Sequence, residues 1–252
     1  MTNTSTQDII ITVLPTGAII SSIISSILAS PLPPPPSSPN RLYIDCSTIS
    51  PLDSRALAQR IHSTTGASFL DAPMSGGTVG AEAGTLTFML GAPSTSVPRA
   101  TSILSHMASR VLHLGDQGSG LCGKLANNYL LALNNIATAE AMNLGMRLGL
   151  DASTLAGMIN SSTGRCWPSE INNPVPGVVP TSPASRDYAG GFGLALMRKD
   201  LGLAIEAGEA VGVDVTKGLG EKARRVYEEC ERDEKCRGKD FSVVYRWLGG
   251  KE

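Results

Sequence analysis

The stretch Gly118–Asn128 (GSGLCGKLANN) divides the sequence into two patterns. Before it, short apolar runs rich in β-branched residues alternate with segments of helical periodicity, as in α/β folds. After it, the apolar residues recur with helical spacing, and no strand is predicted. The sequence therefore predicts an α/β domain with a parallel sheet over residues 1–117 and an all-helical domain over residues 118–252.

Five short segments before that point have the composition of strands. Asp8–Leu14 (DIIITVL) is a continuous apolar run, which is typical of a strand buried on both faces of a parallel sheet. Ser50 followed by Pro51 indicates the N-cap and first residue of a helix that runs to His62. The other predicted strands are Arg41–Cys46, Ser68–Ala72, Leu86–Leu90 and Val111–Leu114, and a further helix lies near Val97–Arg110.

A long helix is predicted from Lys124 to Gly149, because this segment is rich in Ala, Leu and Met and contains no proline. Its apolar residues recur all round the helix, so we expect it to be buried between other elements. A loop rich in proline and glycine over Pro174–Gly193 precedes two more predicted helices, around Arg198–Val211 and Lys217–Arg232.

The composition excludes several classes of partner. The chain has 252 residues, and its 21 Lys and Arg residues nearly balance 22 Asp and Glu residues, so no basic field for a nucleic acid backbone is expected.

The uncharged run from Ile9 to Leu32 is interrupted by Pro15, Gly17 and several serines, and we interpret it as a strand and a helix and not as a membrane span. No presequence is visible, because no Arg precedes Arg41.

The five cysteines show no CxxC spacing, which speaks against a zinc site and against a disulfide framework. We therefore expect reduced thiols and no metal site. The cysteines are Cys46, Cys122, Cys166, Cys230 and Cys236.

Gly118, Gly120 and Gly123 form the only G-x-G-x-x-G spacing in the sequence. A dinucleotide-binding loop would require an acidic residue at the end of the next strand, roughly twenty residues later. That position falls near Glu140, inside the predicted helix. We therefore expect these glycines to let the backbone approach a bound ligand and to direct the helix N-terminus at it.

Four blocks of sequence resemble the 3-hydroxyisobutyrate dehydrogenases, within the wider β-hydroxyacid dehydrogenase family. The resemblance extends over almost the whole chain, and the last two blocks are the most specific. The blocks are DAPMSGGTVGAEAGTLTFMLG (Asp71–Gly91), GSGLCGKLANN (Gly118–Asn128), GRCWPSEINNPVPGV (Gly164–Val178) and GGFGLALMRKDLGLA (Gly190–Ala204).

This resemblance implies a truncated Rossmann-like NAD-binding domain over residues 1–117, followed by a helical domain over 118–252 that holds substrate and forms oligomers, with a long interdomain helix. It implies NAD-dependent oxidation of 3-hydroxyisobutyrate to methylmalonate semialdehyde in valine breakdown, with NADP as a second compatible cofactor. A homo-oligomer, a small hydroxy acid as substrate and a mitochondrial location are further implications, although the absence of a visible presequence also fits the cytoplasm.

Carried over to matching positions, the resemblance makes Lys124 the catalytic acid/base and gives Asn128 the task of orienting the substrate. Their spacing of four residues places them on one helix face. Ser75, Gly76 and Gly77 match the loop that holds the substrate carboxylate. From the residues alone, Lys124 could equally be a solvated lysine in a first helical turn, and the Ser75 loop an ordinary turn.

The resemblance also implies cofactor contacts. Phe192 and Thr48 match positions near the nicotinamide, and Lys199 matches a lysine that reaches the cofactor, although a core phenylalanine and a helix-surface lysine are the simpler alternatives. Leu14 and Pro15 match a turn on the adenine-nucleotide side of the site.

The sequence departs from the family in its first part. The family's glycine-rich phosphate loop and its first two strand-helix units, roughly sixty residues, are not found in this sequence. Ile19 stands where the family has an asparagine that contacts the cofactor. We therefore expect an exposed apolar sheet edge and weakened NAD binding, and the alternative function is a non-catalytic remnant that binds small acids or forms oligomers.

Overall fold

A computed structural model describes residues 8–29, 41–215 and 217–251. The chain divides into two compact units, Met1–Leu125 and Ala126–Glu252, and the boundary lies within the long helix α5 (Ser119–Arg147). No helix in the described ranges is long and apolar enough to cross a membrane.

The first unit alternates strands and helices, as the sequence predicts. Strands β1, β2 and β3 run parallel, β5 runs antiparallel to β3 and β4, and β6 runs parallel to β5. The strands are β1 (Ile9–Thr12), β2 (Leu42–Asp45), β3 (Ser68–Asp71), β4 (Met74–Ser75), β5 (Leu86–Gly91) and β6 (Ala108–Gly115). The helices are α1 (Gly17–Leu28), α2 (Pro51–Thr65), α3 (Gly77–Glu82) and α4 (Val97–Leu104).

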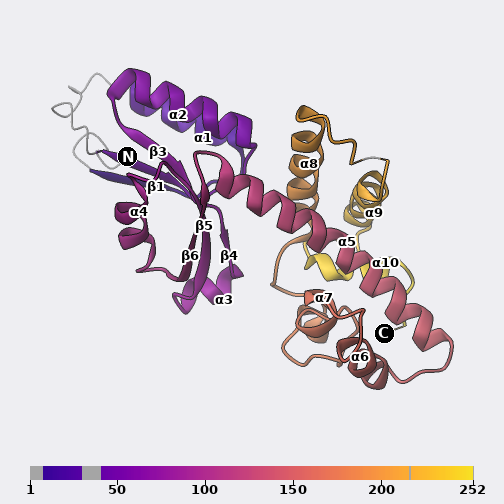
Figure 1. Cartoon of the computed structure of the whole chain (residues 1–252). Coiled ribbons are helices and arrows are strands. Elements are labelled where there is room, and N and C mark those ends of the chain that lie inside the picture. The colour runs from indigo at the N-terminus through magenta and orange to yellow at the C-terminus, as the bar shows by residue number, and fades with distance from the viewer. Residues whose placement is uncertain (1–7, 30–40, 216, 252) are drawn as a thin grey trace. The chain divides into compact units, whose positions relative to one another are not determined.

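Helices cover both faces of this sheet. Figure 1 shows α1 and α2 on one face and α4 on the other. Tyr43 and Phe69 pack toward α1 and α2, whereas Ile44 and Leu70, the next residues of the same strands, pack toward α4. This alternation follows from the period of two along a strand.

Local sequence signals set the ends of α2. The Ser50 hydroxyl accepts a hydrogen bond from the Leu52 amide at 3.2 Å, and Pro51 occupies the first turn. Gly66 ends the helix with φ +71°, a left-handed conformation that favours glycine. The predicted cap is therefore confirmed, and the helix extends three residues beyond the predicted end at His62.

The prediction that the first strand is buried on both faces is wrong. Ile9, Ile11 and Val13 are 39%, 41% and 59% exposed. Within the described residues, β1 pairs with β2 alone and lies at an edge of the sheet. Its outer face therefore lacks the cover that a central strand receives.

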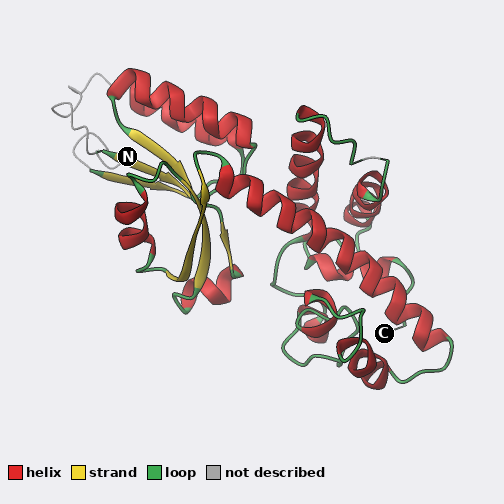
Figure 2. Cartoon of the chain, in the orientation of Figure 1, coloured by secondary structure: helices red, strands yellow, loops and turns green. Residues whose placement is uncertain are grey.

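The second unit consists of helices joined by loops, as Figure 2 shows, with one isolated bridge between Gly193 and Asp240 in its described part. Its largest apolar cluster is built by α5, α8, α9 and the C-terminal turns. The elements after α5 are α6 (Ala152–Asn160), α7 (Trp167–Glu170), η2 (Pro183–Arg186), α8 (Leu194–Ala210), α9 (Gly220–Arg232), η3 (Phe241–Val243) and α10 (Val244–Trp247).

The helix α5 is longer at its start than predicted, and the expectation of burial all round it needs correction. Leu130, Leu144 and Leu148 are 57%, 62% and 76% exposed. One face of α5 is therefore accessible, while Ala132, Ala139 and Met142 are buried in the two apolar clusters of the second unit.

Candidate active site

A buried carboxylate from the sheet fixes the start of α5. Asp71, the last residue of β3, accepts hydrogen bonds from the Gly118 amide at 2.5 Å and from the Leu121 amide at 2.8 Å. The first amides of a helix lack partners within the helix, so this carboxylate satisfies two of them. A negative charge is also favourable at a helix N-terminus.

The glycines of the G-x-G-x-x-G spacing serve packing within the chain. A Cβ atom on Gly120 would lie 2.1 Å from the Met89 carbonyl oxygen, and one on Gly123 would lie 2.4 Å from the Leu114 side chain. Gly118 has φ +90°. Gly120 and Gly123 therefore let α5 approach β5 and β6, while the expected approach of this backbone to a ligand stays a prediction.

Two neighbouring carboxylates lie under this helix start. Burial raises the pKa of Asp71 to about 6, against the opposing effect of its two amide donors. Asp45 pairs with Asp71 across β2 and β3, and burial raises the pKa of Asp45 too. Neither aspartate was singled out from the sequence, because each lies in an apolar strand and acquires its partners only in the fold.

Asp45 also organises the turn after β1. The Ser47 hydroxyl donates to Asp45 at 2.7 Å and accepts a hydrogen bond from the Leu14 amide at 2.8 Å. The predicted cofactor residues Leu14 and Pro15 follow β1, and Thr48 follows β2. Because β1 and β2 are parallel, these residues lie at the same carboxyl edge of the sheet, where α/β folds bind ligands.

The substrate loop predicted from the sequence begins in β4. Ser75 ends this strand, Gly76 has φ +134°, and Gly77 has φ +62°. These two successive glycines adopt backbone conformations that other residues rarely take up.

Lys124 and Asn128 lie one turn apart on α5, and both residues are buried, with exposed fractions of 7% and 1%. The alternative of a solvated Lys124 is therefore wrong. A buried polar side chain requires partners, and a titratable one in a buried setting is a candidate for proton transfer.

Asp200 connects two of the predicted site residues. Its Oδ2 atom accepts a hydrogen bond from the Asn128 Nδ2 atom at 2.6 Å, and its Oδ1 atom lies 3.1 Å from the Lys199 Nζ atom. The Asp200 side chain is buried, while Lys199 is 27% exposed. The structure thus brings Asn128 and Lys199 together on one carboxylate, a link between α5 and α8 that the sequence did not reveal.

Phe192 is half-buried and packs edge-on against Phe241, with ring centroids 5.9 Å apart. Thr48 is also half-buried. Both residues therefore keep some accessible surface. The glycines of Gly118–Gly123 pack against other parts of the chain, which does not fit the binding of a diphosphate.

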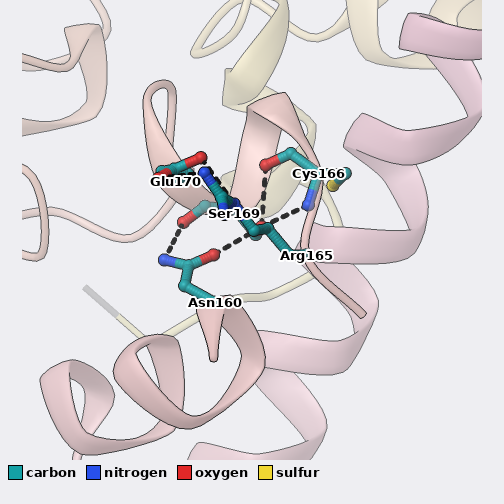
Figure 3. Close-up of polar contacts among 5 residues, drawn as sticks. All are labelled: Asn160, Arg165, Cys166, Ser169 and Glu170. Carbon is teal, nitrogen blue, oxygen red and sulfur yellow. Dashed lines mark hydrogen bonds and ion pairs between the residues drawn. The ribbon is translucent and has the colours of Figure 1, made fainter. Parts of the chain in front are cut away.

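A second polar network stabilises the short helix α7. As Figure 3 shows, the Ser169 hydroxyl donates to Asn160 at 2.7 Å and accepts a hydrogen bond from the Cys166 amide at 2.8 Å. Arg165 and Glu170 form a two-pronged ion pair beside it, with both hydrogen bonds at 2.9 Å. These contacts hold the segment that presents Trp167, which is 49% exposed.

Among the residues that the structure describes, no group of three His, Cys, Asp or Glu side chains could hold a metal ion. The described cysteines are all free thiols.

Two family models match the chain. One is described as NAD-binding of NADP-dependent 3-hydroxyisobutyrate dehydrogenase and matches residues 118–248. The other is described as the NAD binding domain of 6-phosphogluconate dehydrogenase and matches residues 1–115. The expected cofactor class, NAD with NADP also compatible, agrees with both descriptions.

The following curated relatives are named as 3-hydroxyisobutyrate dehydrogenases. The chain is 46% identical over 240 residues to mitochondrial 3-hydroxyisobutyrate dehydrogenase of Drosophila melanogaster, covering 95% of this chain and 71% of that protein. It is 42% identical over 241 residues to probable 3-hydroxyisobutyrate dehydrogenase of Mycobacterium bovis, covering 96% of this chain and 78% of that protein. The similar proteins thus include one named as mitochondrial and one from a bacterium.

Solved structures confirm the predicted fold class, a Rossmann-like sheet domain followed by a helical domain. The Mycobacterium tuberculosis 3-hydroxyisobutyrate dehydrogenase structure with L-serine superposes with a TM-score of 0.88 at 41% identity, covering 97% of this chain and 80% of that chain. A Salmonella typhimurium structure superposes with a TM-score of 0.77 at 22% identity and supports the fold alone. With identity above 40% over nearly all of its length, the chain belongs to the 3-hydroxyisobutyrate dehydrogenase family, as its motifs predicted.

Proposed function

We propose that this chain catalyses the NAD-dependent oxidation of 3-hydroxyisobutyrate to methylmalonate semialdehyde. Family membership supports the reaction class. The single observation that carries the proposal is the pair of buried polar side chains, Lys124 and Asn128, on one face of α5.

In this proposal Lys124 is the catalytic acid/base. Oxidation of an alcohol removes the hydroxyl proton while hydride leaves the same carbon, so a proton acceptor has to lie beside the hydroxyl oxygen. The Lys124 amine would accept that proton, which breaks the O–H bond and forms an N–H bond. In the reverse direction the lysine ammonium would return the proton to the carbonyl oxygen.

Asn128 would orient the substrate. Its amide has two N–H groups, and the Nδ2 atom donates one hydrogen bond to Asp200. The Oδ1 atom of Asn128 accepts from Asn127 at 3.1 Å. The amide plane is therefore held from both ends, and the second N–H group is the one we assign to a substrate oxygen.

Ser75, Gly76 and Gly77 would hold the substrate carboxylate through the serine hydroxyl and backbone amides. Anions bind readily to successive backbone amides in such conformations. The positive φ angles of both glycines support this role.

We further propose that Leu14, Pro15, Thr48, Phe192 and Lys199 contact the cofactor. When bound, NAD supplies the hydride acceptor. Thr48 and Phe192 would orient the nicotinamide ring and exclude water from it, and Lys199 would contribute a positive charge, held in place by Asp200.

The proposed division of labour assigns residues 1–117 to NAD binding and residues 118–252 to substrate binding and homo-oligomer formation. A mitochondrial location is proposed from the names of the animal relatives. We expect no nucleic acid partner.

A second candidate function is a non-catalytic module that binds small acids or forms oligomers. The observations that favour it are the exposed apolar residues Ile9, Ile11 and Val13 of β1, together with the packed glycines of Gly118–Gly123. Such a module would keep the residues for substrate binding and lack turnover.

Substrate comparison tests the proposed function. NADH formation would be followed with 3-hydroxyisobutyrate and, in parallel, with 6-phosphogluconate and glycerate. We expect the highest kcat/KM with 3-hydroxyisobutyrate. A higher value with another acid would reassign the substrate, and a folded chain inactive with all three would favour the non-catalytic module.

A further inference from the structure

Asp240 carries a buried carboxylate and is not one of the residues assigned a role above. The whole residue is 1% exposed. Its Oδ1 atom accepts hydrogen bonds from the Ser242 amide at 2.9 Å and from the Asn172 Nδ2 atom at 3.1 Å. Its Oδ2 atom accepts a hydrogen bond from the Phe192 amide at 2.7 Å. Three donors on one carboxylate offset the cost of its burial.

The segment around Asp240 also holds the Phe192 loop through its backbone. The Phe241 amide donates to the Phe192 carbonyl at 2.9 Å, and the Leu194 amide donates to the Lys239 carbonyl at 2.9 Å. The Asp240 amide donates to the Tyr188 carbonyl at 2.8 Å. The chain on both sides of Phe192 is thus tied to one short stretch.

Gly191 shows how closely this carboxylate approaches the loop. A Cβ atom at this position would lie 2.2 Å from the Asp240 Oδ2 atom, and Gly191 has φ +67°. The loop can therefore accept the carboxylate only with a glycine beside Phe192. The same carboxylate accepts the hydrogen bond of the Phe192 amide and so fixes the backbone that carries the Phe192 ring.

An ordinary N-cap does not require this arrangement. Asp151, which caps α6, is exposed and uses its Oδ1 atom for both contacts to Thr154. Asp240 caps η3 with Oδ1 and places the other oxygen on the Phe192 amide. The second contact adds nothing to the cap, so it calls for a separate role.

We propose that Asp240 is a positioning residue that acts through the Phe192 amide and sets the orientation of the Phe192 ring. The consequence for catalysis rests on the proposed function, in which Phe192 contacts the nicotinamide. Asp240 itself touches neither substrate nor cofactor in this account. Its effect reaches the cofactor through the peptide of Phe192.

Asp240→Asn separates this role from capping. Asparagine caps helices about as well as aspartate does, so the Ser242 contact can be kept. The amide has a single acceptor oxygen, however, and its NH2 group would then face the Phe192 N–H group. The variant thus removes the acceptor of Phe192 while it preserves the cap.

The experiment combines hydrogen exchange with kinetics. In Asp240→Asn we expect amide exchange of a peptide covering residues 189–195 to rise about tenfold. We expect KM for NAD to rise about tenfold with a smaller change in kcat, because a ring contact made before and during hydride transfer affects binding uniformly. Asp151→Ala, which removes a cap elsewhere, should change neither quantity.

Exchange in residues 189–195 that stays at the wild-type rate in Asp240→Asn would overturn the proposal. Faster exchange throughout the second unit with an unchanged KM would also overturn it, because Asp240 would then act only as a structural cap. If the wild-type chain has no turnover, the proposed function fails, and the exchange data still decide whether Asp240 positions Phe192.

Discussion

The Nδ2 atom of Asn128 donates a hydrogen bond to the Oδ2 atom of Asp200 at 2.6 Å, across 72 positions of sequence. Asp200 is buried and also pairs with Lys199 at 3.1 Å. One carboxylate therefore sets the orientation of a proposed substrate residue and the position of a proposed cofactor residue. The first prediction tests this link.

Replacing Asp200 with Asn should lower kcat/KM for 3-hydroxyisobutyrate about tenfold to a hundredfold, because the Asn128 amide loses a charged acceptor. Steady-state NADH formation measures the effect. Asp151→Asn is the matched control, since Asp151 is exposed and asparagine can replace it as an N-cap. Equal kcat/KM values in the two variants would show that Asp200 has no role in the site.

The buried Asp71 predicts a pH dependence of stability. Its pKa lies near 6 in the folded protein and near its ordinary value in the unfolded chain. The folded state therefore binds more protons between about pH 4 and 6, and the free energy of unfolding should fall as pH rises through this range, by at most about 1.4 kcal/mol per pH unit. Urea unfolding at several pH values measures this slope.

Asp71→Asn should reduce that slope while it lowers stability overall, because the amide cannot accept from both Gly118 and Leu121. Asp45, whose pKa burial also raises, should leave a residual slope in the same direction. A variant with the full wild-type slope would show that Asp71 does not titrate in this range.

Gly120→Ala should destabilise the first unit by about 1–3 kcal/mol, because the added methyl group would overlap the Met89 carbonyl oxygen. Gly157→Ala is the control in α6, where nothing lies within 4 Å of the added atom. It should stabilise the protein by up to about 1 kcal/mol. Thermal unfolding of both variants checks the prediction, and equal shifts would contradict the packing role of Gly120.

The network in Figure 3 predicts unequal effects of two neighbouring substitutions. Ser169→Ala should cost about 1–3 kcal/mol, because it removes a buried hydroxyl and leaves its partly buried partners, the Asn160 side chain and the Cys166 amide, unsatisfied. Glu170→Gln should cost less than about 1 kcal/mol, because the ion pair with Arg165 is exposed. Denaturant unfolding distinguishes them, and a larger loss in Glu170→Gln would refute this ranking.

Local patterns predicted much of this fold. The Ser50–Pro51 pair marked the start of α2, and the apolar periodicity after Lys124 predicted the long helix. The start of α5 at Ser119 was missed, because its cap is the carboxylate of Asp71, almost fifty residues earlier. Contacts between distant segments leave no local pattern.

The candidate site shows the same limit. Lys124 and Asn128 could be named from their motif, and their burial agrees with a functional role without testing it. Asp200 could not be named in this way, because its partner Asn128 lies on another helix, 72 positions away in the sequence. The exposed edge at β1 agrees with the exposed apolar sheet edge expected from the comparison with the family, whereas the composition of β1 alone matches that of a buried strand.

The central claim is that the buried Lys124 is the acid/base of a dehydrogenase. The most direct test is the rate of NADH formation from 3-hydroxyisobutyrate by the whole chain and by Lys124→Ala, with Lys217→Ala, a lysine 84% exposed, as the control. We predict a loss of about a hundredfold to ten-thousandfold in kcat in Lys124→Ala alone, with the fold intact by circular dichroism. Turnover in Lys124→Ala equal to that of the unchanged chain would contradict the account.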